Sequence, residues 1–348
     1  MMRILLCCAV VLTAACTASG PRLSSLPRSE LLAGTPCALP RSAGPLLSRE
    51  AVFELDDEMR EFVAASVGRM EDQPAKLRRL LSAMKERGMF SLEYDETLTR
   101  TARATFYDLE GNCLSFTILF VSLARAAGLN VSYQAVDMPP TWSRESDLVI
   151  VANHINALVE TRSGSDFVVD FNLAGYQSER KRRVVDDDHV LALFYTNLGA
   201  EALIRKDYGT SFRYLRGAIE ADPDVTDAWV NLGVLYRRQG QMAHAEAAYR
   251  EALSTNPRAG SALSNLANLH ARLGNAAAAA HYSELIRRHQ RRNPYYHYLL
   301  AREAFAEQRL EDAGAAVRHA LRLKSDEPAF DELRALVSAE LAARRGDE

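Results

Sequence analysis

A 34-residue period in the C-terminal half constrains this chain more than any other feature of its sequence. A repeat of this length accommodates two helices joined by a turn, and one helix pair cannot bury its apolar face alone. Stacked units would bury those faces, which predicts an all-α superhelix for residues 192–327. The positions in register are Leu198-Gly199, Leu232-Gly233 and Leu266-Ala267; Ala218, Ala252 and Ile286; and Pro223 and Pro257.

The second unit carries the residues by which the repeat type is recognised. Trp229, Leu232-Gly233 and Tyr236 follow the order W-x2-L-G-x2-Y, and Ala245 and Tyr249 follow in the second helix. The unit resembles the tetratricopeptide repeat. A fourth unit begins at Pro294 and completes the array of four units. Residues 328–348 look like the terminal capping helix.

This resemblance implies a concave groove that binds a peptide segment or a partner protein. Aromatic and arginine side chains are typical anchors at such surfaces. The alternative is that the aromatic residues of the fourth unit pack against the capping helix. The expected groove residues are Arg237 in the second unit and Tyr295, Tyr298, Arg302 and Phe305 in the fourth.

The first residues are typical of an export signal. "MMRILLCCAVVLTAAC" has a positive charge at Arg3, then an apolar run, then small residues before Cys16. The run is too short to span a bilayer. Cys16 resembles the lipidated cysteine of bacterial lipoproteins, although Thr13 stands where leucine is usual. This predicts a signal peptide over residues 1–15 and a lipid anchor on the periplasmic side, with the outer membrane favoured. A plain secretory signal is the alternative.

Residues 16–48 are rich in Pro, Gly, Ser and Leu and show no persistent period. Such composition predicts a flexible tether between the membrane and the first folded domain. Lipidation of Cys16 would leave Cys37 and Cys113 as the remaining mature thiols. An oxidising compartment would permit a disulfide between them. The loose segment around Cys37 disfavours a durable bridge.

Residues 49–180 are expected to form an α+β domain. Helical patterns run through residues 56–70, 75–88 and 96–107, and a fourth helix follows Gly111-Asn112. The period then changes to two, which is typical of strands. Residues 130–138 alternate, and residues 147–172 are predicted to form a hairpin around Ser163-Gly164-Ser165. Residues 181–191 are dense in charge and are interpreted as a linker.

Cys113 stands where the Gly111-Asn112 turn becomes a long apolar helix. The N-terminus of a helix offers unpaired N–H groups and a partial positive charge, which stabilise a thiolate. The same groups can hold the oxyanion of an acyl intermediate. Cysteine is also among the most buried residue types, so a small core residue is the plain alternative.

A base and an acid follow Cys113 in the expected order. His154 lies in "VANHINALVE" and Asp170 in "FVVDFN", the two strands of the predicted hairpin. Opposed residues of paired antiparallel strands lie about 5 Å apart. His154 and Asp170 should therefore be opposite or diagonal. Taken separately, the histidine would be a core residue and the aspartate a strand-end residue.

Cys113, His154 and Asp170 in this order resemble the transglutaminase-like superfamily of papain-like cysteine enzymes. "GNCLSFTILFVSLARAAGLNVSYQAV" is similar to the family's cysteine helix and following strand, "NHINALVE" to its histidine strand and "FVVDFN" to its acid strand. The resemblance implies a Cys-His-Asp catalytic triad. Many members have Ala-Trp after the histidine, whereas this chain has Ile155-Asn156. That departure concerns the wall of the site, and with it the choice of substrate.

Two further residues are candidates for the cleft. Tyr107 precedes Cys113 by six residues, and its hydroxyl could assist the oxyanion. Trp142 lies in "MPPTWSRES", a loop that could close over the site. A packing role is the alternative for each.

Other kinds of site find little support in the sequence. No histidine or cysteine cluster has metal-ligand spacing, so no metal is expected. No phosphate loop or dinucleotide fingerprint is present, so no cofactor is expected. The net charge of -3 argues against nucleic acid as the main partner.

The sequence therefore predicts a lipid-anchored cysteine enzyme that transfers or hydrolyses an acyl group of a peptide amide. Its repeats would recruit a protein partner. The alternative is a scaffold lipoprotein in which the cysteine-enzyme fold is inactive and the repeats carry the function. The residues after His154 leave room for that alternative.

Overall fold

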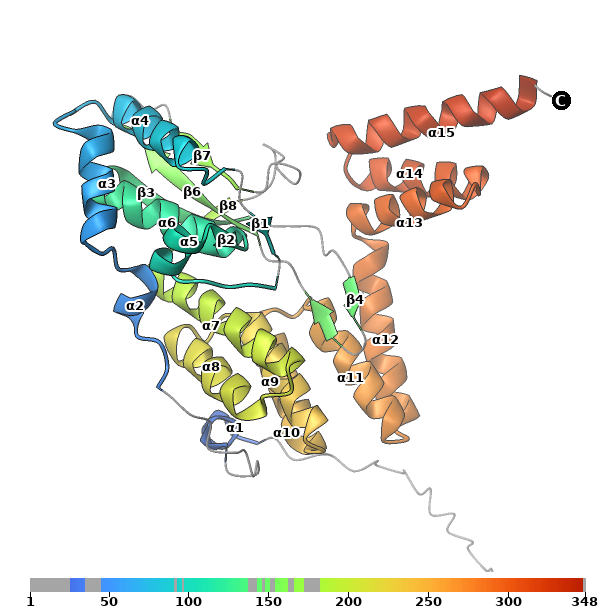
Figure 1. The fold of residues 1–348 in the computed structure, drawn as a ribbon. Helices are drawn as coiled ribbons and strands as arrows, with labels where there is room; N and C mark the ends of the chain where they lie inside the picture. Colours follow the sequence, from blue (N-terminus) through green and yellow to red (C-terminus); the bar gives the residue numbers. More distant parts are fainter. Residues whose placement is uncertain are drawn as a thin grey trace, which may run out of the picture.

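The computed structural model describes residues 26–34, 45–90, 93–95, 97–136, 143–145, 148–150, 154–161, 166–171 and 182–346. Figure 1 shows helices and a sheet forming one part, with an array of paired helices beside it. The predicted signal peptide, Cys16, Cys37 and Trp142 lie outside the described residues. The helices before the array are α1 (Arg28–Ala33), α2 (Arg49–Phe53), α3 (Asp57–Val67), α4 (Gln73–Glu86), α5 (Ala102–Asp108) and α6 (Cys113–Ala126).

The main sheet has four antiparallel strands in the order β7-β6-β3-β8. The alternation predicted for residues 130–138 is confirmed by β3, and the expected hairpin partners are β6 and β7. The turn at residues 163–165 lies outside the described residues. Helix α6 packs against β3 and β6, so the helix that begins with Cys113 covers this sheet. The strands are β3 (Asn130–Val136), β6 (His154–Glu160), β7 (Phe167–Val169) and β8 (Arg182–Val185).

Two short strand pairs form sheets of their own, separate from the main sheet. Strand β1 (Glu93–Tyr94) runs parallel to β2 (Glu110–Gly111) just before α6. Strand β4 (Ser143–Glu145) pairs antiparallel with β5 (Leu148–Ile150). The predicted strand at residues 147–160 is therefore divided between β5 and β6, which belong to different sheets.

The interpretation of residues 181–191 as a linker is wrong. Residues 182–185 form β8, which pairs with β3 at the edge of the four-stranded sheet, and the following helix already begins at Asp187. Val185 is buried while Val184 is exposed. Charged residues are tolerated on an edge strand because one side of it faces solvent. The run of charged residues therefore forms a strand and the start of the array, not a linker.

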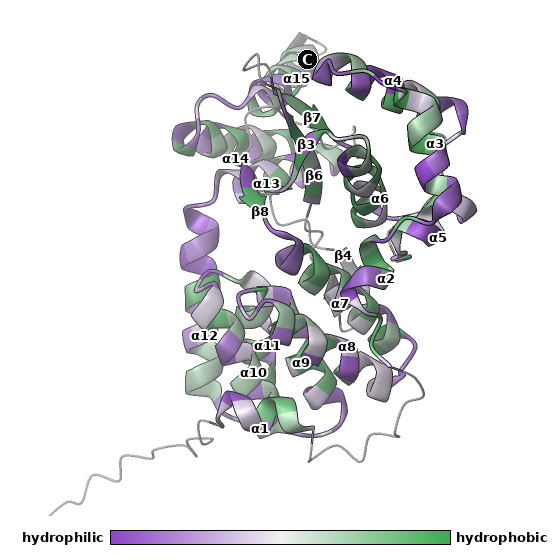
Figure 2. Cartoon of the chain, turned by 90° about the vertical axis from the view of Figure 1, so that its left-hand side faces the viewer, coloured by the Kyte–Doolittle hydropathy of each residue, from purple (hydrophilic) through white to green (hydrophobic). Residues whose placement is uncertain are grey.

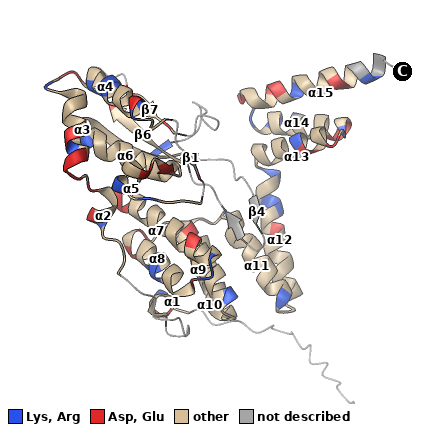
Figure 3. Ribbon diagram, viewed as in Figure 1, with Lys and Arg blue, Asp and Glu red and all other residues tan. Residues whose placement is uncertain are grey.

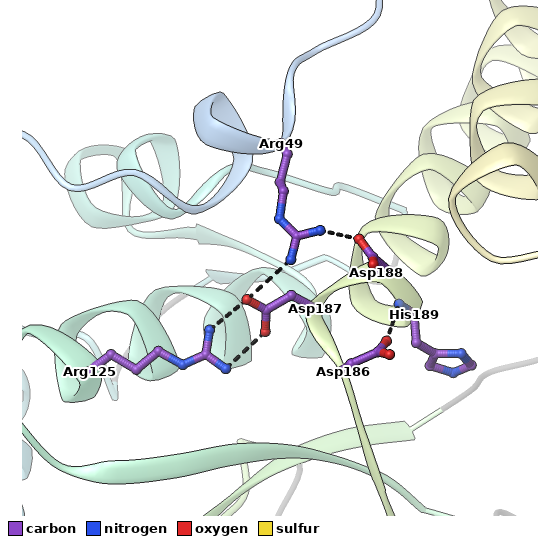
Figure 4. Close-up of polar contacts among 6 residues, drawn as sticks. All are labelled: Arg49, Arg125, Asp186, Asp187, Asp188 and His189. Atoms are coloured by element: carbon purple, nitrogen blue, oxygen red, sulfur yellow. Dashed lines mark hydrogen bonds and ion pairs between the residues drawn. The ribbon is translucent and has the colours of Figure 1, made fainter.

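Aspartates in this run join the two parts of the chain, as Figure 4 shows. Arg125, in the last turn of α6, makes two hydrogen bonds of 2.8 and 2.9 Å to Asp187. Arg49 of α2 contacts Asp187 at 3.6 Å and pairs with Asp188. Asp186 caps the helix by accepting from the backbone N–H of His189 at 2.9 Å. Acidic residues are favourable at a helix N-terminus.

Four helix pairs and a final helix make up the array. Gly233 of α9 packs against the ring of Tyr249 on α10, and Gly199 of α7 packs against Leu215 on α8. Small residues thus allow the two helices of a pair to approach closely. The pairs are α7 (Asp187–Ile204) with α8 (Tyr208–Ala221), α9 (Thr226–Arg238) with α10 (Met242–Thr255), α11 (Gly260–Arg272) with α12 (Ala276–Arg291), and α13 (Pro294–Ala306) with α14 (Leu310–Leu323); α15 (Pro328–Gly346) follows.

Part of the predicted flexible tether is ordered on the array. Residues 28–33 form α1, in which Leu31 is fully buried. The hydroxyl of Tyr236 donates to the carbonyl of Leu31, and Arg28 pairs with Glu251 at 2.6 Å. A six-residue helix is not stable alone in water. Docking on α9 and α10 therefore stabilises a segment whose composition indicated a tether.

The buried apolar residues form two separate cores. The larger core extends from Leu31 to Leu269 and includes the sheet, α6 and the first helix pairs. The smaller one joins α13, α14 and α15. Helix α12 has no fully buried residue, and Figure 2 shows that its C-terminal part is hydrophilic where it leads to α13. The last pair therefore has its own core.

Figure 3 shows acidic and basic residues interspersed along the helices. Among the helices that the structure describes, none combines the length and apolar character needed to cross a bilayer.

Candidate active site

Cys113 is the first residue of α6, as the sequence predicted. Asn112 caps the helix, accepting from the backbone N–H of Ser115 at 3.0 Å and donating to the Thr99 hydroxyl at 2.8 Å. Gly111 has φ 148°, and a Cβ there would lie 2.8 Å from that of Ser115. Glycine is therefore needed at this turn. Cys113 is a half-buried free thiol at the helix N-terminus.

His154 begins β6 and contacts Asp170, one residue beyond the end of β7. Its Nε2 lies 2.9 Å from Oδ1 and 2.7 Å from Oδ2 of Asp170, and the side chains are 5% and 4% exposed. Ala157 pairs with Val169, so continuation of this register sets Asp170 opposite Asn156 and diagonal to His154. The predicted proximity of His154 and Asp170 is confirmed.

Cys113 is the second partner of the imidazole. Burial lowers the pKa of His154, but hydrogen bonds with Asp170 and with Cys113 outweigh burial and raise that pKa to about 9. With Nε2 against Asp170, Nδ1 is the ring nitrogen that could exchange a proton with the thiol. The structure thus brings together all three residues predicted as a triad.

Thr117 joins the first turn of α6 to the histidine strand. Its hydroxyl lies 2.8 Å from the carbonyl oxygen of Cys113 and 3.2 Å from that of Ile155. The side chain is fully buried. This contact fixes the helix start against β6 beside His154, so the relative placement of thiol and imidazole depends on buried, rigid elements.

Asn156 is a site residue that the sequence reasoning missed. Its Nδ2 donates to Oδ2 of Asp170 at 3.1 Å, and the residue is fully buried. In the sequence, Asn156 is visible only as a departure from the Ala-Trp pattern. The period of two was the available signal, since residues 154 and 156 share one face of a strand.

The expectation that Tyr107 assists the oxyanion is not supported by its placement. Its hydroxyl donates to Asp56 at 2.9 Å and lies 3.2 Å from Glu58, at the start of α3. The residue is 41% exposed. Tyr107 therefore ties α5 to α3 at the surface. The second cleft candidate, Trp142, lies outside the described residues.

Comparison with known proteins identifies the helix pairs. Residues 226–258 and 264–328 match two family models described as tetratricopeptide repeat. The C-terminal helices are tetratricopeptide repeats. The first match lies within the predicted array and the second ends one residue beyond it, and the helices of the first pair continue the same 34-residue register.

Similar solved structures include MamA from Desulfovibrio magneticus RS-1, with 16% identity, 44% of this chain and 88% of that chain covered, and a TM-score of 0.27. The first TPR of Spaghetti (RPAP3) bound to an HSP90 peptide has 21% identity, covers 44% and 98%, and has a TM-score of 0.23. A thermophilic TPR protein from Thermus thermophilus has 17% identity, covers 43% and 81%, and has a TM-score of 0.27. No curated protein matches the chain.

Most residues predicted to line the tetratricopeptide groove lie on α13. The aromatic residues among them pack against the capping helix α15, which was the alternative interpretation. The hydroxyl of Tyr295 donates to Glu327 at 2.7 Å. The rings of Tyr295 and Tyr298 lie 5.4 and 4.9 Å from that of Phe330 on α15. Phe305 packs against the same core. These aromatics therefore support the capping helix.

The two predicted arginines of the groove differ in their surroundings. The guanidinium carbon of Arg302 lies 6.0 Å from the ring of Tyr298. Arg237 lies on α9 and is half-buried. The placement of these two residues does not test peptide binding, so the groove stays a prediction. Within the described residues, no three His, Cys, Asp or Glu side chains gather as metal ligands, and the expectation of no metal likewise stays a prediction.

Proposed function

We propose that this chain is a cysteine enzyme that transfers or hydrolyses the acyl group of a peptide or glutamine amide, with Cys113 as nucleophile. The observation that carries the proposal is the imidazole of His154, which lies 2.7 Å from Asp170 and whose pKa is raised by its interactions with Asp170 and Cys113. A nucleophile, a base and an orienting acid in contact are the parts that covalent acyl transfer needs.

In the first half-reaction the Cys113 thiolate attacks the carbonyl carbon and forms the C–S bond. Because the pKa of His154 is raised to about 9, the imidazole is protonated at neutral pH and can donate its proton to the departing amine as the C–N bond breaks. Asn112 already accepts from the N–H of Ser115, so the N–H groups of Cys113 and Leu114 are those left in the first turn of α6 to hold the oxyanion. The product is a thioester and a free amine.

In the second half-reaction water attacks the thioester. His154, now neutral, takes a proton from that water, the C–S bond breaks, and the thiolate–imidazolium pair is restored with a free carboxylic acid. An amine in place of water would yield a new amide. Asp170 keeps Nε2 engaged throughout, which directs Nδ1 toward the sulfur.

The tetratricopeptide repeats support a protein or peptide partner, since such superhelices present extended surfaces for binding. In this proposal the partner carries or delivers the acyl substrate. We extend the proposal to export, with lipidation of Cys16 and placement on the periplasmic side of the outer membrane. A Cys16→Ser variant that stays in the membrane fraction would contradict the anchor.

Alkylation of the purified protein by iodoacetamide across pH 5 to 9 tests the enzyme proposal, with modification of Cys113 followed by peptide mass spectrometry. The expected result is faster reaction at pH 6 than for the denatured chain, whose thiols titrate near about 8.5. His154→Ala should abolish that advantage.

His189→Ala is the matched control, because His189 makes a similar pair with Asp222 at 2.6 Å in the repeats. It should leave the alkylation of Cys113 unchanged. If Cys113 reacts like the denatured thiol and does not respond to His154→Ala, the enzyme proposal fails and the inactive scaffold is favoured.

A further inference from the structure

We propose that Asn156 is a positioning residue that holds the carboxylate of Asp170 in line with His154. This inference rests on the function proposed above and adds a residue to its site. The amide Nδ2 of Asn156 lies 3.1 Å from Oδ2 of Asp170, and the same oxygen lies 2.7 Å from Nε2 of His154. One carboxylate oxygen therefore accepts from both side chains.

The need for such a contact follows from where Asp170 lies. Strand β7 ends at Val169, and the last registered pair of β6 and β7 joins Ala157 to Val169. Asp170 is one residue beyond that pair, so the ladder does not itself determine how its carboxylate is turned. A side-chain donor can fix this rotation.

Asn156 is well placed to supply that donor. It lies in β6, which is paired on both sides, with β3 and with β7. In the register it faces Gln134 of β3, and it is fully buried. Its backbone is held by the ladder with β3, one residue beyond the last pair with β7, and its amide can fix the side chain of a residue at a strand end.

The burial of the amide also points to Asp170. Among the described residues, Oδ1 of Asn156 has no hydrogen-bond partner. Burying an unsatisfied polar atom is unfavourable, and an apolar side chain would avoid that cost. Turning the amide over would place Oδ1 against the carboxylate. The donor bond to Asp170 therefore accounts for both the residue type and its orientation.

Two variants separate positioning from packing. Asn156→Leu has a similar volume and no donor, and Asn156→Ser keeps a polar group too short to reach Asp170. The matched control is Asn130→Leu, because Nδ2 of Asn130 donates to Glu160 at 2.8 Å at the far end of the same strand pair. Circular dichroism establishes which variants fold.

The first measurement is the titration of the His154 imidazole by NMR, made in a Cys113→Ser background so that it does not depend on a reactive thiol. His154→Gln identifies the resonance. In this background Asp170 is the partner that still raises the pKa of the imidazole. In either Asn156 variant we expect it to fall toward about 6.5, while Asn130→Leu leaves it unchanged.

The second measurement is the alkylation of Cys113 by iodoacetamide at pH 6 in the chain that retains its thiol. Hydrogen bonds to charged groups are strong enough for an expected loss of about tenfold in rate. Asn130→Leu should retain the full rate.

The two measurements distinguish the two proposals. Folded Asn156 variants with an unchanged or raised His154 pKa would overturn the positioning role, whatever the thiol does. A pKa that falls while wild-type Cys113 reacts like a denatured thiol would retain the positioning role and reject the enzyme. If Asn156→Leu does not fold, Asn156→Ser decides the outcome.

Discussion

Glu201, on the first repeat helix α7, accepts a hydrogen bond from the backbone N–H of Thr99 at 2.9 Å. The hydroxyl of Thr99 in turn accepts from Asn112 at 2.8 Å, and Asn112 caps the helix that begins with Cys113. The repeats are therefore not merely attached to the α+β part. Their first helix supports the loop that holds the candidate nucleophile in place.

Replacing Glu201 should lower the free energy of unfolding when no acceptor remains for the Thr99 N–H, and raise it when an uncharged acceptor remains. Glu201→Ala leaves the Thr99 N–H without its acceptor, and we expect the free energy of unfolding to fall by about 1–3 kcal/mol. Glu201→Gln keeps an acceptor and removes a charge. Urea denaturation of both variants checks this. The control Glu220→Gln, in an exposed pair with Arg216 at 2.7 Å, should change stability by less than about 0.5 kcal/mol.

The pH dependence of the glutamine variant follows from the sign of the shift. Burial raises the pKa of Glu201, and the hydrogen bonds with Thr99 only partly oppose it. A carboxyl whose pKa is raised on folding contributes stability below its unfolded value, which is lost as the pH rises through the folded one. The advantage of Glu201→Gln over wild type should therefore grow above about pH 4.3. An advantage that shrinks with rising pH would contradict the buried charge.

His154 should make a second pH-dependent contribution to stability, at a higher pH than that of Glu201. Burial opposes protonation, but Asp170 and Cys113 raise the pKa of His154 to about 9. The stabilisation is fully present below about pH 6.5 and is lost between about 6.5 and 9. In the chain that retains Cys113, the stability difference from His154→Gln should be greatest at pH 6 and decline toward pH 9. A difference that increases over this range would refute the protonated imidazole.

The elements found from the sequence are those whose patterns are local. Gly111-Asn112 before an apolar run is a helix start by its own chemistry, and alternation marked both β3 and the hairpin that joins His154 to Asp170. The 34-residue register can be recognised because several units bury the same positions, as at Ala218 and Ala252, which are fully buried. In these cases the residues that make the pattern also make the structure.

The elements that were missed depend on contacts with distant residues. Strand β8 lies in a charge run, and only its pairing with β3 shows it to be a strand. Helix α1 is ordered by docking on α9 and α10 rather than by its own composition. The role of Asn156 likewise depends on which residue of β7 lies opposite it, and a hairpin register is not determined by a sequence pattern alone.

Leu31 should control the docking of α1. The residue is fully buried, and large-to-small substitution at such sites typically costs about 2–5 kcal/mol when the segment stays docked. Because α1 is short, we expect Leu31→Ala to release it instead, so that amide exchange in residues 28–33 accelerates at least tenfold. Exchange in α6 should stay as in wild type. The exposed Ser29→Ala is the control, and equal effects of the two substitutions would exclude a docking role for Leu31.

Gly233 should be the least replaceable of the helical glycines in the repeats. A Cβ at this position would lie 2.4 and 2.5 Å from ring carbons of Tyr249, which is fully buried. Alanine favours a helix over glycine by about 1 kcal/mol, but overpacking against a rigid ring typically costs about 1–3 kcal/mol. We therefore expect Gly233→Ala to lower the urea midpoint. Gly314→Ala is the matched control, because its nearest neighbour is the flexible end of Arg318 at 3.1 Å. That variant should be at least as stable as wild type. Equal midpoints for the two variants would show that Tyr249 can move, and that close packing of α9 on α10 does not require glycine.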